Sequence, residues 1–130
     1  MSFLPYSTDT GAIQPWEYMP AAAGTYQVGQ LLNASAGKLT AVRDVSITTP
    51  GYLCMADITV IDNELVPVTR IKHDAIYETT LSEASESAAE GSKLRISAGG
   101  LQVDAGAEGP FEVTYIEGTA AGSLVRGRFH

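Results

Sequence analysis

The side chains that could carry chemistry are few, and they do not gather along the chain. The single cysteine, Cys54, stands between Leu53 and Met55 in the most apolar stretch. A nucleophilic thiolate needs a base and an electropositive setting, and the surrounding sequence supplies neither. We therefore expect Cys54 to pack as a small hydrophobic side chain. With one cysteine, no intramolecular disulfide can form.

The two histidines give no metal-binding pattern. His73 precedes Asp74 in an expected turn, and His130 is the last residue of the sequence. No second histidine or cysteine stands at ligand spacing from either one. The sequence also holds no calcium-binding loop and no phosphate-binding P-loop. We therefore expect neither a metal nor another cofactor.

The sequence also lacks the motifs of common hydrolases. No G-x-S-x-G motif occurs. Paired carboxylates can be brought together by folding from distant positions, so a small hydrolase with hidden acids stays an open alternative. Most acidic residues, however, alternate outward on expected strands or occupy turns, which is typical of a solvated surface. The sequence favours a protein that is not an enzyme.

The charge balance restricts the partners. The 130 residues carry a formal net charge of −7, and the pI is about 4.6. Nucleic-acid binding needs a basic footprint that neutralises phosphates, so we expect no nucleic acid, and the same sign disfavours an anionic membrane. No stretch approaches the roughly 20 apolar residues of a membrane helix, and no secretory signal is visible. We expect synthesis in a reducing cytoplasm.

Alternation of apolar and polar residues predicts an all-β fold. Residues 93–96, 101–104 and 111–115 send successive side chains to opposite faces, one toward a core and one toward water. About nine short strands joined by tight turns are expected, which favours a small β-barrel or sandwich. Residues 82–90 are the one helix candidate. They lack an apolar stripe, so an ordered acidic loop is an equal alternative.

Two segments predict where particular strands lie. Residues 52–61 are mostly apolar, which is typical of a strand buried on much of both faces. Pro67 interrupts the expected strand 64–72 and lacks the N–H that a ladder requires. We therefore expect that strand to lie at a sheet edge or to be bulged at the proline.

Residues 1–24 are predicted to form an extended N-terminal arm on a β-rich body of residues 25–130. Prolines 5, 15 and 20 disfavour a helix or a central strand there. A disordered leader is the alternative, but disordered segments are usually poor in aromatic residues. No periodic strand places the four rings of the arm in the core. We therefore predict that they carry partner contacts of the arm, and we leave open whether the arm contacts its own body, a sister subunit or the shell. We also predict that the body folds without residues 1–20. These rings are Phe3, Tyr6, Trp16 and Tyr18.

Arg126 and Arg128 lie two residues apart on the last expected strand and therefore share one face. The simpler interpretation pairs them with glutamates of a neighbouring strand, where each ion pair contributes little stability. The alternative is that they contact an acidic partner subunit.

Several turn-and-strand segments resemble the small head decoration proteins of tailed phages and prophages. In order, these segments are 29–32 (GQLL), 37–40 (GKLT), 65–68 (LVPV), 90–94 (EGSKL), 99–101 (GGL) and 118–125 (GTAAGSLV). The resemblance covers roughly residues 25–130. It implies a compact β-rich body, often trimeric, that binds the outside of a shell of major capsid protein. It also implies an N-terminal arm that helps to hold the shell, and no catalytic residues.

The resemblance predicts a bacteriophage structural protein on the virion capsid surface, made in the host cytoplasm and acting as a homotrimer that stabilises the capsid. The longer aromatic arm and the acidic segment 82–90 depart from the best-known examples of that family. A carbohydrate- or peptide-binding β module of a fibre or adhesin is the alternative. Such a module would carry a surface cluster of Tyr, Trp and acidic residues around a shallow groove.

Overall fold

The computed structural model describes residues 3–8, 16–42, 49–105 and 108–130, with the backbone alone for residues 6–8. In these ranges the chain forms thirteen strands and no helix. The prediction of an all-β fold is confirmed. Residues 82–92 follow an irregular path with turns, as expected of a segment rich in small and acidic residues without an apolar stripe.

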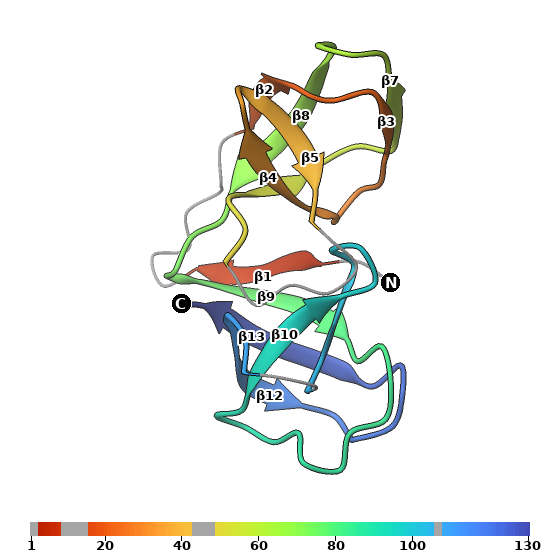
Figure 1. Cartoon of the computed structure of the whole chain (residues 1–130). Helices are drawn as coiled ribbons and strands as arrows, with labels where there is room; N and C mark the ends of the chain where they lie inside the picture. Colours follow the sequence, from red (N-terminus) through yellow and green to blue (C-terminus); the bar gives the residue numbers. More distant parts are fainter. Residues whose placement is uncertain (1–2, 9–15, 43–48, 106–107) are drawn as a thin grey trace.

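Six strands form the larger sheet, in the order β1-β9-β13-β12-β10-β11. Every neighbouring pair in it is antiparallel. Its strands occupy the lower half of Figure 1. They are β1 (Leu4–Thr8), β9 (Ala75–Thr80), β10 (Lys93–Ser97), β11 (Gln102–Asp104), β12 (Phe111–Ile116) and β13 (Leu124–Phe129).

Five strands form a second antiparallel sheet, in the order β2-β8-β6-β4-β5. It lies in the upper half of Figure 1, beside a two-stranded ribbon of β3 and β7. The strands of the five-stranded sheet are β2 (Glu17–Pro20), β4 (Leu31–Ser35), β5 (Lys38–Ala41), β6 (Tyr52–Cys54) and β8 (Leu65–Arg70). The ribbon consists of β3 (Gly24–Tyr26) and β7 (Ile58–Val60).

Neither large sheet is closed into a barrel, although both curl. An isolated bridge joins Ala21, just after β2, to Leu39 on β5, and another joins Leu81, just after β9, to Val103 on β11. The described residues also form more strands than the nine or so expected. Strands of three residues, such as β3 and β7, are too short to show an alternating pattern in the sequence.

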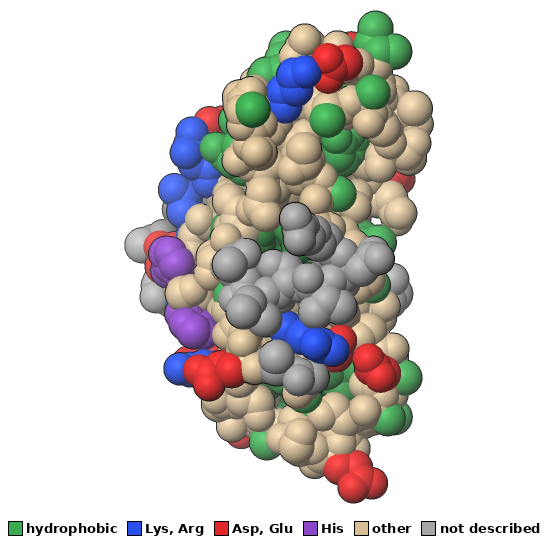
Figure 2. All heavy atoms as spheres, viewed as in Figure 1, with side chains coloured by type: hydrophobic (Ala, Val, Ile, Leu, Met, Phe, Trp, Pro, Cys, Tyr) green, Lys and Arg blue, Asp and Glu red, His purple; other side chains and the backbone are tan. Residues whose placement is uncertain are grey.

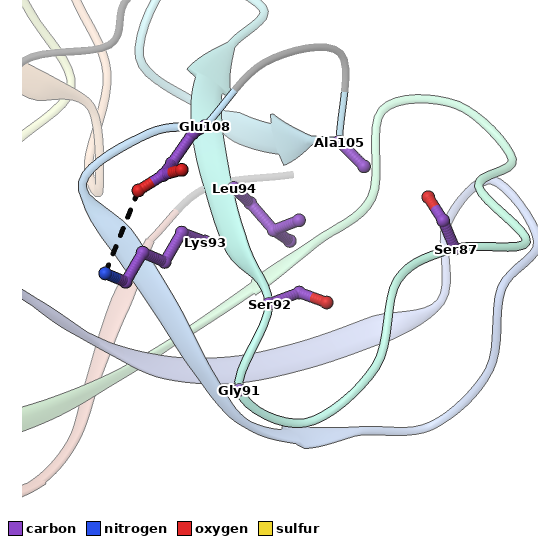
Figure 3. A pocket seen from close by; sticks show the side chains of 7 residues that line it. All are labelled: Ser87, Gly91, Ser92, Lys93, Leu94, Ala105 and Glu108. Atoms are coloured by element: carbon purple, nitrogen blue, oxygen red, sulfur yellow. Dashed lines mark ion pairs between the residues drawn. The ribbon is translucent and has the colours of Figure 1, made fainter.

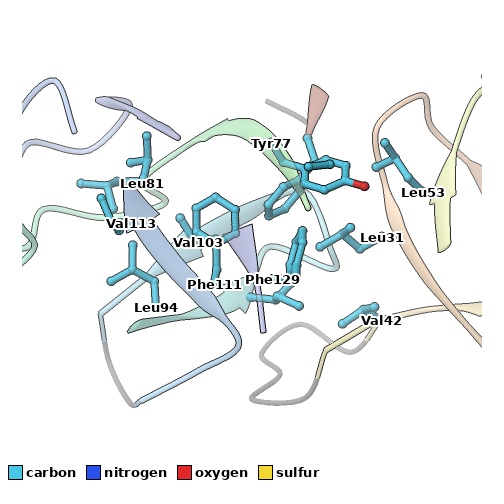
Figure 4. Close-up of a cluster of buried hydrophobic side chains, with 14 residues drawn as sticks. Leu31, Val42, Leu53, Tyr77, Leu81, Leu94, Val103, Phe111, Val113 and Phe129 are labelled. Atoms are coloured by element: carbon cyan, nitrogen blue, oxygen red, sulfur yellow. The ribbon is translucent and has the colours of Figure 1, made fainter. Parts of the chain in front are cut away.

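The buried side chains form two clusters. The first, called the aromatic core, lies against the six-stranded sheet (Figure 4) and comprises Phe3, Leu31, Val42, Leu53, Ala75, Tyr77, Leu81, Leu94, Ile96, Val103, Phe111, Val113, Val125 and Phe129. The second, called the small core, comprises Ala21, Tyr26, Leu32, Leu39, Cys54, Val60, Val66 and Val68. The five-stranded sheet contributes residues to both cores, and it therefore connects the two halves of the molecule.

Strands β4 and β6 show how this sheet serves both cores. Leu31 and Leu53 belong to the aromatic core, whereas the next residues, Leu32 and Cys54, belong to the small core. Successive strand residues point to opposite faces, so the sheet is buried on both sides at this position. Burial on two faces therefore holds for β6, while the expected strand 52–61 divides into β6 and β7.

Strand β8 is not an edge strand, because it lies between β2 and β6. Pro67 is tolerated there because the paired part of β6 ends at Cys54, opposite Val68. Beyond that point the carbonyl of Pro67 accepts a hydrogen bond from the Met55 N–H at 3.0 Å. The ladder with β6 therefore ends where the proline would have to donate.

Residues 1–24 contribute one strand to each large sheet. Strand β1 pairs with β9 at the margin of the six-stranded sheet, and β2 pairs with β8 at the margin of the five-stranded sheet. Residues 1–2 and 9–15 lie outside the described residues. Both strands that lie within residues 1–24, β1 and β2, are therefore hydrogen-bonded to strands of the same chain.

Candidate docking surface

Phe3, the first ring predicted to bind a partner, lies inside the chain's own aromatic core. Its side chain is fully buried, and its ring lies 5.7 Å from those of Phe111 and Phe129. Its backbone N–H donates to the Gly29 carbonyl at 2.9 Å. The expectation that no strand places Phe3 in a core was wrong, because the residue before an edge strand can reach the core without any visible periodicity. Within a single chain, Phe3 contacts its own body.

Trp16 and Tyr18, in contrast, lie on the surface, with 54% and 62% of their side chains exposed. They stand two residues apart, at and just before the start of β2. The side chain of Tyr6 lies outside the described residues, although its backbone belongs to β1. The structure thus separates the predicted set: one ring is in the core and two are exposed.

The register of β2 against β8 shows which neighbours accompany Tyr18. Tyr18 lies opposite Pro67, and Pro20 lies opposite Leu65. Because directly opposed residues and residues two apart share a face, Tyr18 and Leu65 lie on the same outer face. Met19 points the other way and packs against the small core.

We name the exposed residues of this region the apolar strip. It consists of Trp16, Tyr18, Leu65 and Ile61, which is 72% exposed in the turn between β7 and β8. Figure 2 shows hydrophobic side chains at the surface of the upper end of the molecule, where these strands lie in Figure 1. Exposed apolar patches that monomers do not need for folding commonly mark interaction sites.

The sequence did not reveal Leu65 or Ile61 as surface residues. Residues 65–68 are all apolar, so alternation could not distinguish the outward Leu65 from the inward Val66. Asn63, in the turn beside Ile61, has a positive φ of 71°. In the sequence, the turn-forming pair Asp62 and Asn63 between two apolar runs is the one available signal that Ile61 lies at a hairpin end.

The backbone of β2 offers little for strand addition. The Ala21 N–H donates to the Glu64 carbonyl at 3.0 Å, so alternation directs the backbone groups of Met19 toward β8 and those of Tyr18 and Pro20 away from it. Pro20 has no N–H to offer. A proline-limited, short edge is one way in which proteins avoid edge pairing, so the side chains of β2 are better suited than its backbone to contact a partner.

An ion pair holds β2 in place beside the strip. Arg70 Nε lies 2.7 Å from Glu17 Oε2, and Arg70 Nη2 lies 3.2 Å from Glu17 Oε1. The hydrogen bond from Arg70 lowers the pKa of the Glu17 carboxyl below its usual value. The Arg70 guanidinium also lies 5.5 Å from the centre of the Tyr52 ring. The pair therefore orients the strand that presents Tyr18.

The arginines of β13 occupy a different part of the molecule. Arg126 Nε lies 2.9 Å from Glu78 Oε2 on β9, and its guanidinium lies 5.1 Å from the ring centre of Tyr115 on β12. Arg128 lies opposite Glu112 in the ladder between β12 and β13. For Arg126 the structure gives the simpler of the two interpretations, pairing with a neighbouring strand.

Among the described residues, Glu83 and Asp104 line one surface hollow of about 270 Å³, in which Arg95 pairs with Asp104. Cys54 is buried, its Sγ donates to the Ala56 carbonyl at 3.1 Å, and burial raises the pKa of the thiol. No group of three or more potential metal ligands occurs in the part of the chain that the structure describes. Asp104, the most buried acid among these residues, forms an ion pair with Arg95.

A surface hollow of about 430 Å³ lies beside the acidic loop (Figure 3). Lys93 Nζ lies 3.8 Å from Glu108 Oε1 at its rim, and Leu94 contributes an apolar wall. Ser87 and Ser92 supply hydroxyl groups on the opposite side. Among the described lining residues Glu108 is the single acid, so this hollow does not present a carboxylate pair.

No protein-family model matches the chain, and no curated protein sequence matches it. Within the described ranges, no helix is long and apolar enough to cross a membrane. The fold and the surface therefore define the class alone: an all-β protein with two cores and an exposed apolar strip on its five-stranded sheet.

Proposed function

We propose that this protein is a phage-type capsid decoration protein, which binds the outer surface of the major capsid shell and stabilises it. The observation that carries the proposal is the apolar strip, in which Trp16 and Tyr18 are more than half exposed. The resemblance of residues 25–130 to head decoration proteins supplies the biological setting. In this proposal the protein acts as a homotrimer on the virion, with a sandwich-like body and the strip as its docking surface.

The chemistry of the strip suits a binding role. Trp and Tyr bury 150–250 Å² each and dominate many interfaces, and they are enriched among residues that contribute most to binding energy. Tyr18 on β2, with Trp16 just before the strand and Leu65 on the same face as Tyr18, gives a small and mostly apolar contact area. A single copy would bind weakly through it.

Repetition on a shell would compensate for weak single contacts. When many binding units are joined, each further contact becomes effectively intramolecular, and the assembly binds more tightly than any one copy. The net charge of −7 keeps separate copies apart and soluble before assembly. Neither requirement involves a cleft or a reactive group.

Co-sedimentation with capsids of the corresponding phage or prophage tests the proposal. We expect Tyr18→Ala and Trp16→Ala each to lower occupancy of the shell by at least tenfold, because each removes an exposed ring and leaves the cores intact. The matched control is Tyr115→Ala, which removes a tyrosine that is 43% exposed on the other sheet. If occupancy is unchanged in the first two variants, or falls equally in all three, the strip is not the docking surface.

Substitution is a sharper test than deletion of the arm. Removing residues 1–20 would also remove Phe3 from the aromatic core and β1 from β9. We now expect such a deletion to destabilise the body, contrary to the prediction from sequence. Loss of binding after deletion would therefore not distinguish a lost contact from a lost fold.

A carbohydrate-binding β module is the second candidate, and the same two rings favour it. Exposed aromatic rings such as those of Trp16 and Tyr18 provide surfaces against which the apolar faces of sugar rings can stack. Binding of the isolated protein to a glycan array, lost in Tyr18→Ala and retained in Tyr115→Ala, would support this function. Binding to capsids with no glycan signal would support the first.

A further inference from the structure

Strand β1 occupies a well-defined acceptor site on the body. Four residues of β1 pair with β9, from Leu4 opposite Glu78 to Thr8 opposite Ala75. Immediately before them, Phe3 inserts into the aromatic core and donates its N–H to the Gly29 carbonyl. The site therefore has three parts. These are the edge of β9, the Gly29 carbonyl as a hydrogen-bond acceptor, and the space beside Phe111 and Phe129 that the Phe3 ring fills.

The occupant of this site is a short segment at the margin of the sheet. Strand β1 lies at the margin of its sheet and pairs with β9 alone. Residues 9–16 separate it from β2, which belongs to the other sheet. Eight residues can span at most roughly 29 Å when fully extended, so the segment has the reach to leave its own body for an adjacent one.

Two copies of the chain offer identical segments and identical acceptor sites. Every contact that holds residues 3–8 in their own body would form equally well in a neighbour, as in other exchanges of terminal elements. Only the effective concentration that comes from covalent linkage, which is on the order of millimolar for short tethers, favours the intramolecular arrangement. Copies packed side by side would present competing segments at a similar concentration.

We propose that the groove beside β9 accepts residues 3–8 from a second copy, so that neighbouring copies exchange β1. The inference deepens the proposed function, on which its biological setting rests, by naming a second copy as a partner of the arm. Exchange would link adjacent copies through a fully buried ring and a strand ladder. The apolar strip would stay exposed, because β2 pairs with β8 in the five-stranded sheet and not with β9.

Disulfide trapping with full-length chains tests the exchange without any capsid. In a Cys54→Ala background, Leu4→Cys chains are mixed with Glu78→Cys chains, unfolded and refolded together, and oxidised. The two positions are directly opposed across β1 and β9, so a bond between different chains requires exchange. We expect a covalent heterodimer joined at positions 4 and 78, with a yield that rises with protein concentration up to about 1 mM.

Two controls make either outcome informative. The double variant with both cysteines in one chain should form an internal bond and run as a monomer, which shows that the pair can react. Mixed Leu124→Cys and Thr80→Cys chains should give no heterodimer above background, because these opposed positions lie within the body on β13 and β9.

The proposal is overturned if the double variant closes efficiently while the mixed 4 and 78 chains give no more heterodimer than the control at every concentration. It is also overturned if the double variant fails to close, since β1 would then not occupy the groove. Neither result bears on Tyr18-dependent binding to capsids, so the failure of this inference is distinguishable from the failure of the proposed function.

Discussion

The two large sheets place their aromatic residues in opposite ways. The six-stranded sheet turns its rings inward, where Phe129 lies within 5.2–5.7 Å of Phe111, Tyr77 and Phe3. Its outer face carries charge pairs such as Arg126 with Glu78. The five-stranded sheet covers the small core, against which Tyr52 of β6 packs, whereas Tyr18 of β2 is 62% exposed. The six-stranded sheet thus buries three rings together, and the five-stranded sheet leaves its ring at the margin outside.

The exposed apolar residues show the same division. Among the described residues, seven large hydrophobic side chains are exposed, and five of them lie between positions 16 and 65: Trp16, Tyr18, Val28, Ile61 and Leu65. Leu4 and Tyr115 are the two on the six-stranded sheet. One half of the molecule thus contains the aromatic core, and the other half carries the candidate docking surface.

The largest expected effect comes from emptying the aromatic core. Phe129→Ala removes a ring that contacts three others, and should lower the free energy of unfolding by about 3–5 kcal/mol because it leaves a cavity. Denaturant unfolding measures this. Trp16→Ala, which removes a larger ring from the surface, should change the same quantity by no more than roughly 0.5 kcal/mol. Equal losses in the two variants would abolish the distinction between the halves.

Glycine substitutions sharpen the comparison at the level of close packing. A Cβ at Gly127 on β13 would collide with the Glu112 carbonyl and the Phe111 ring, whereas one at Gly51 would meet nothing within 4 Å. We expect Gly127→Ala to cost about 1–3 kcal/mol of unfolding free energy, as overpacking does. Gly51→Ala should leave the unfolding midpoint nearly unchanged. A tolerated alanine at 127 would show that β12 and β13 pack more loosely than described.

Cys54 reports on the integrity of the small core. Because burial raises the pKa of its thiol, we expect no reaction with an aromatic disulfide reagent in the native state and full reaction after unfolding. The raised pKa also means that the neutral thiol stabilises the fold below the unfolded pKa, and that this contribution is lost as pH rises through the folded pKa. Fast labelling of the native protein at neutral pH would show that the small core opens readily.

The smallest expected effect concerns the pair that holds β2. Because the pKa of Glu17 is lowered in the folded state, its contribution to stability is present above the unfolded pKa and is lost as pH falls through the folded pKa. The thermal midpoints of the natural chain and Glu17→Gln should therefore differ slightly at neutral pH and converge in acid. A difference that persists or grows below that range would assign the effect to something other than the ion pair with Arg70.

Local pattern predicted the class of fold but not the pairing of its strands. Residues 93–96 and 111–115 alternate visibly, and they form β10 and β12. Pro67 was expected at a sheet edge or at a bulge, yet β8 is central and its paired register with β6 is regular, because a neighbouring strand can end opposite a proline. Which strands are neighbours depends on contacts between distant residues, such as Arg126 with Glu78, and sequence spacing holds no record of them.

The candidate docking surface, too, was predictable from the sequence only in part. Composition and alternation alone determined that the chain is acidic and β-rich. They also showed that residues 1–24 combine three prolines with four aromatic residues before position 20. Only the folded arrangement decided that Phe3 completes a core while Trp16 and Tyr18 remain outside. The physical reason is that burial of a ring depends on which sheet edge its segment joins. That choice is made by long-range pairing with β9 and β8, not by the residues next to it.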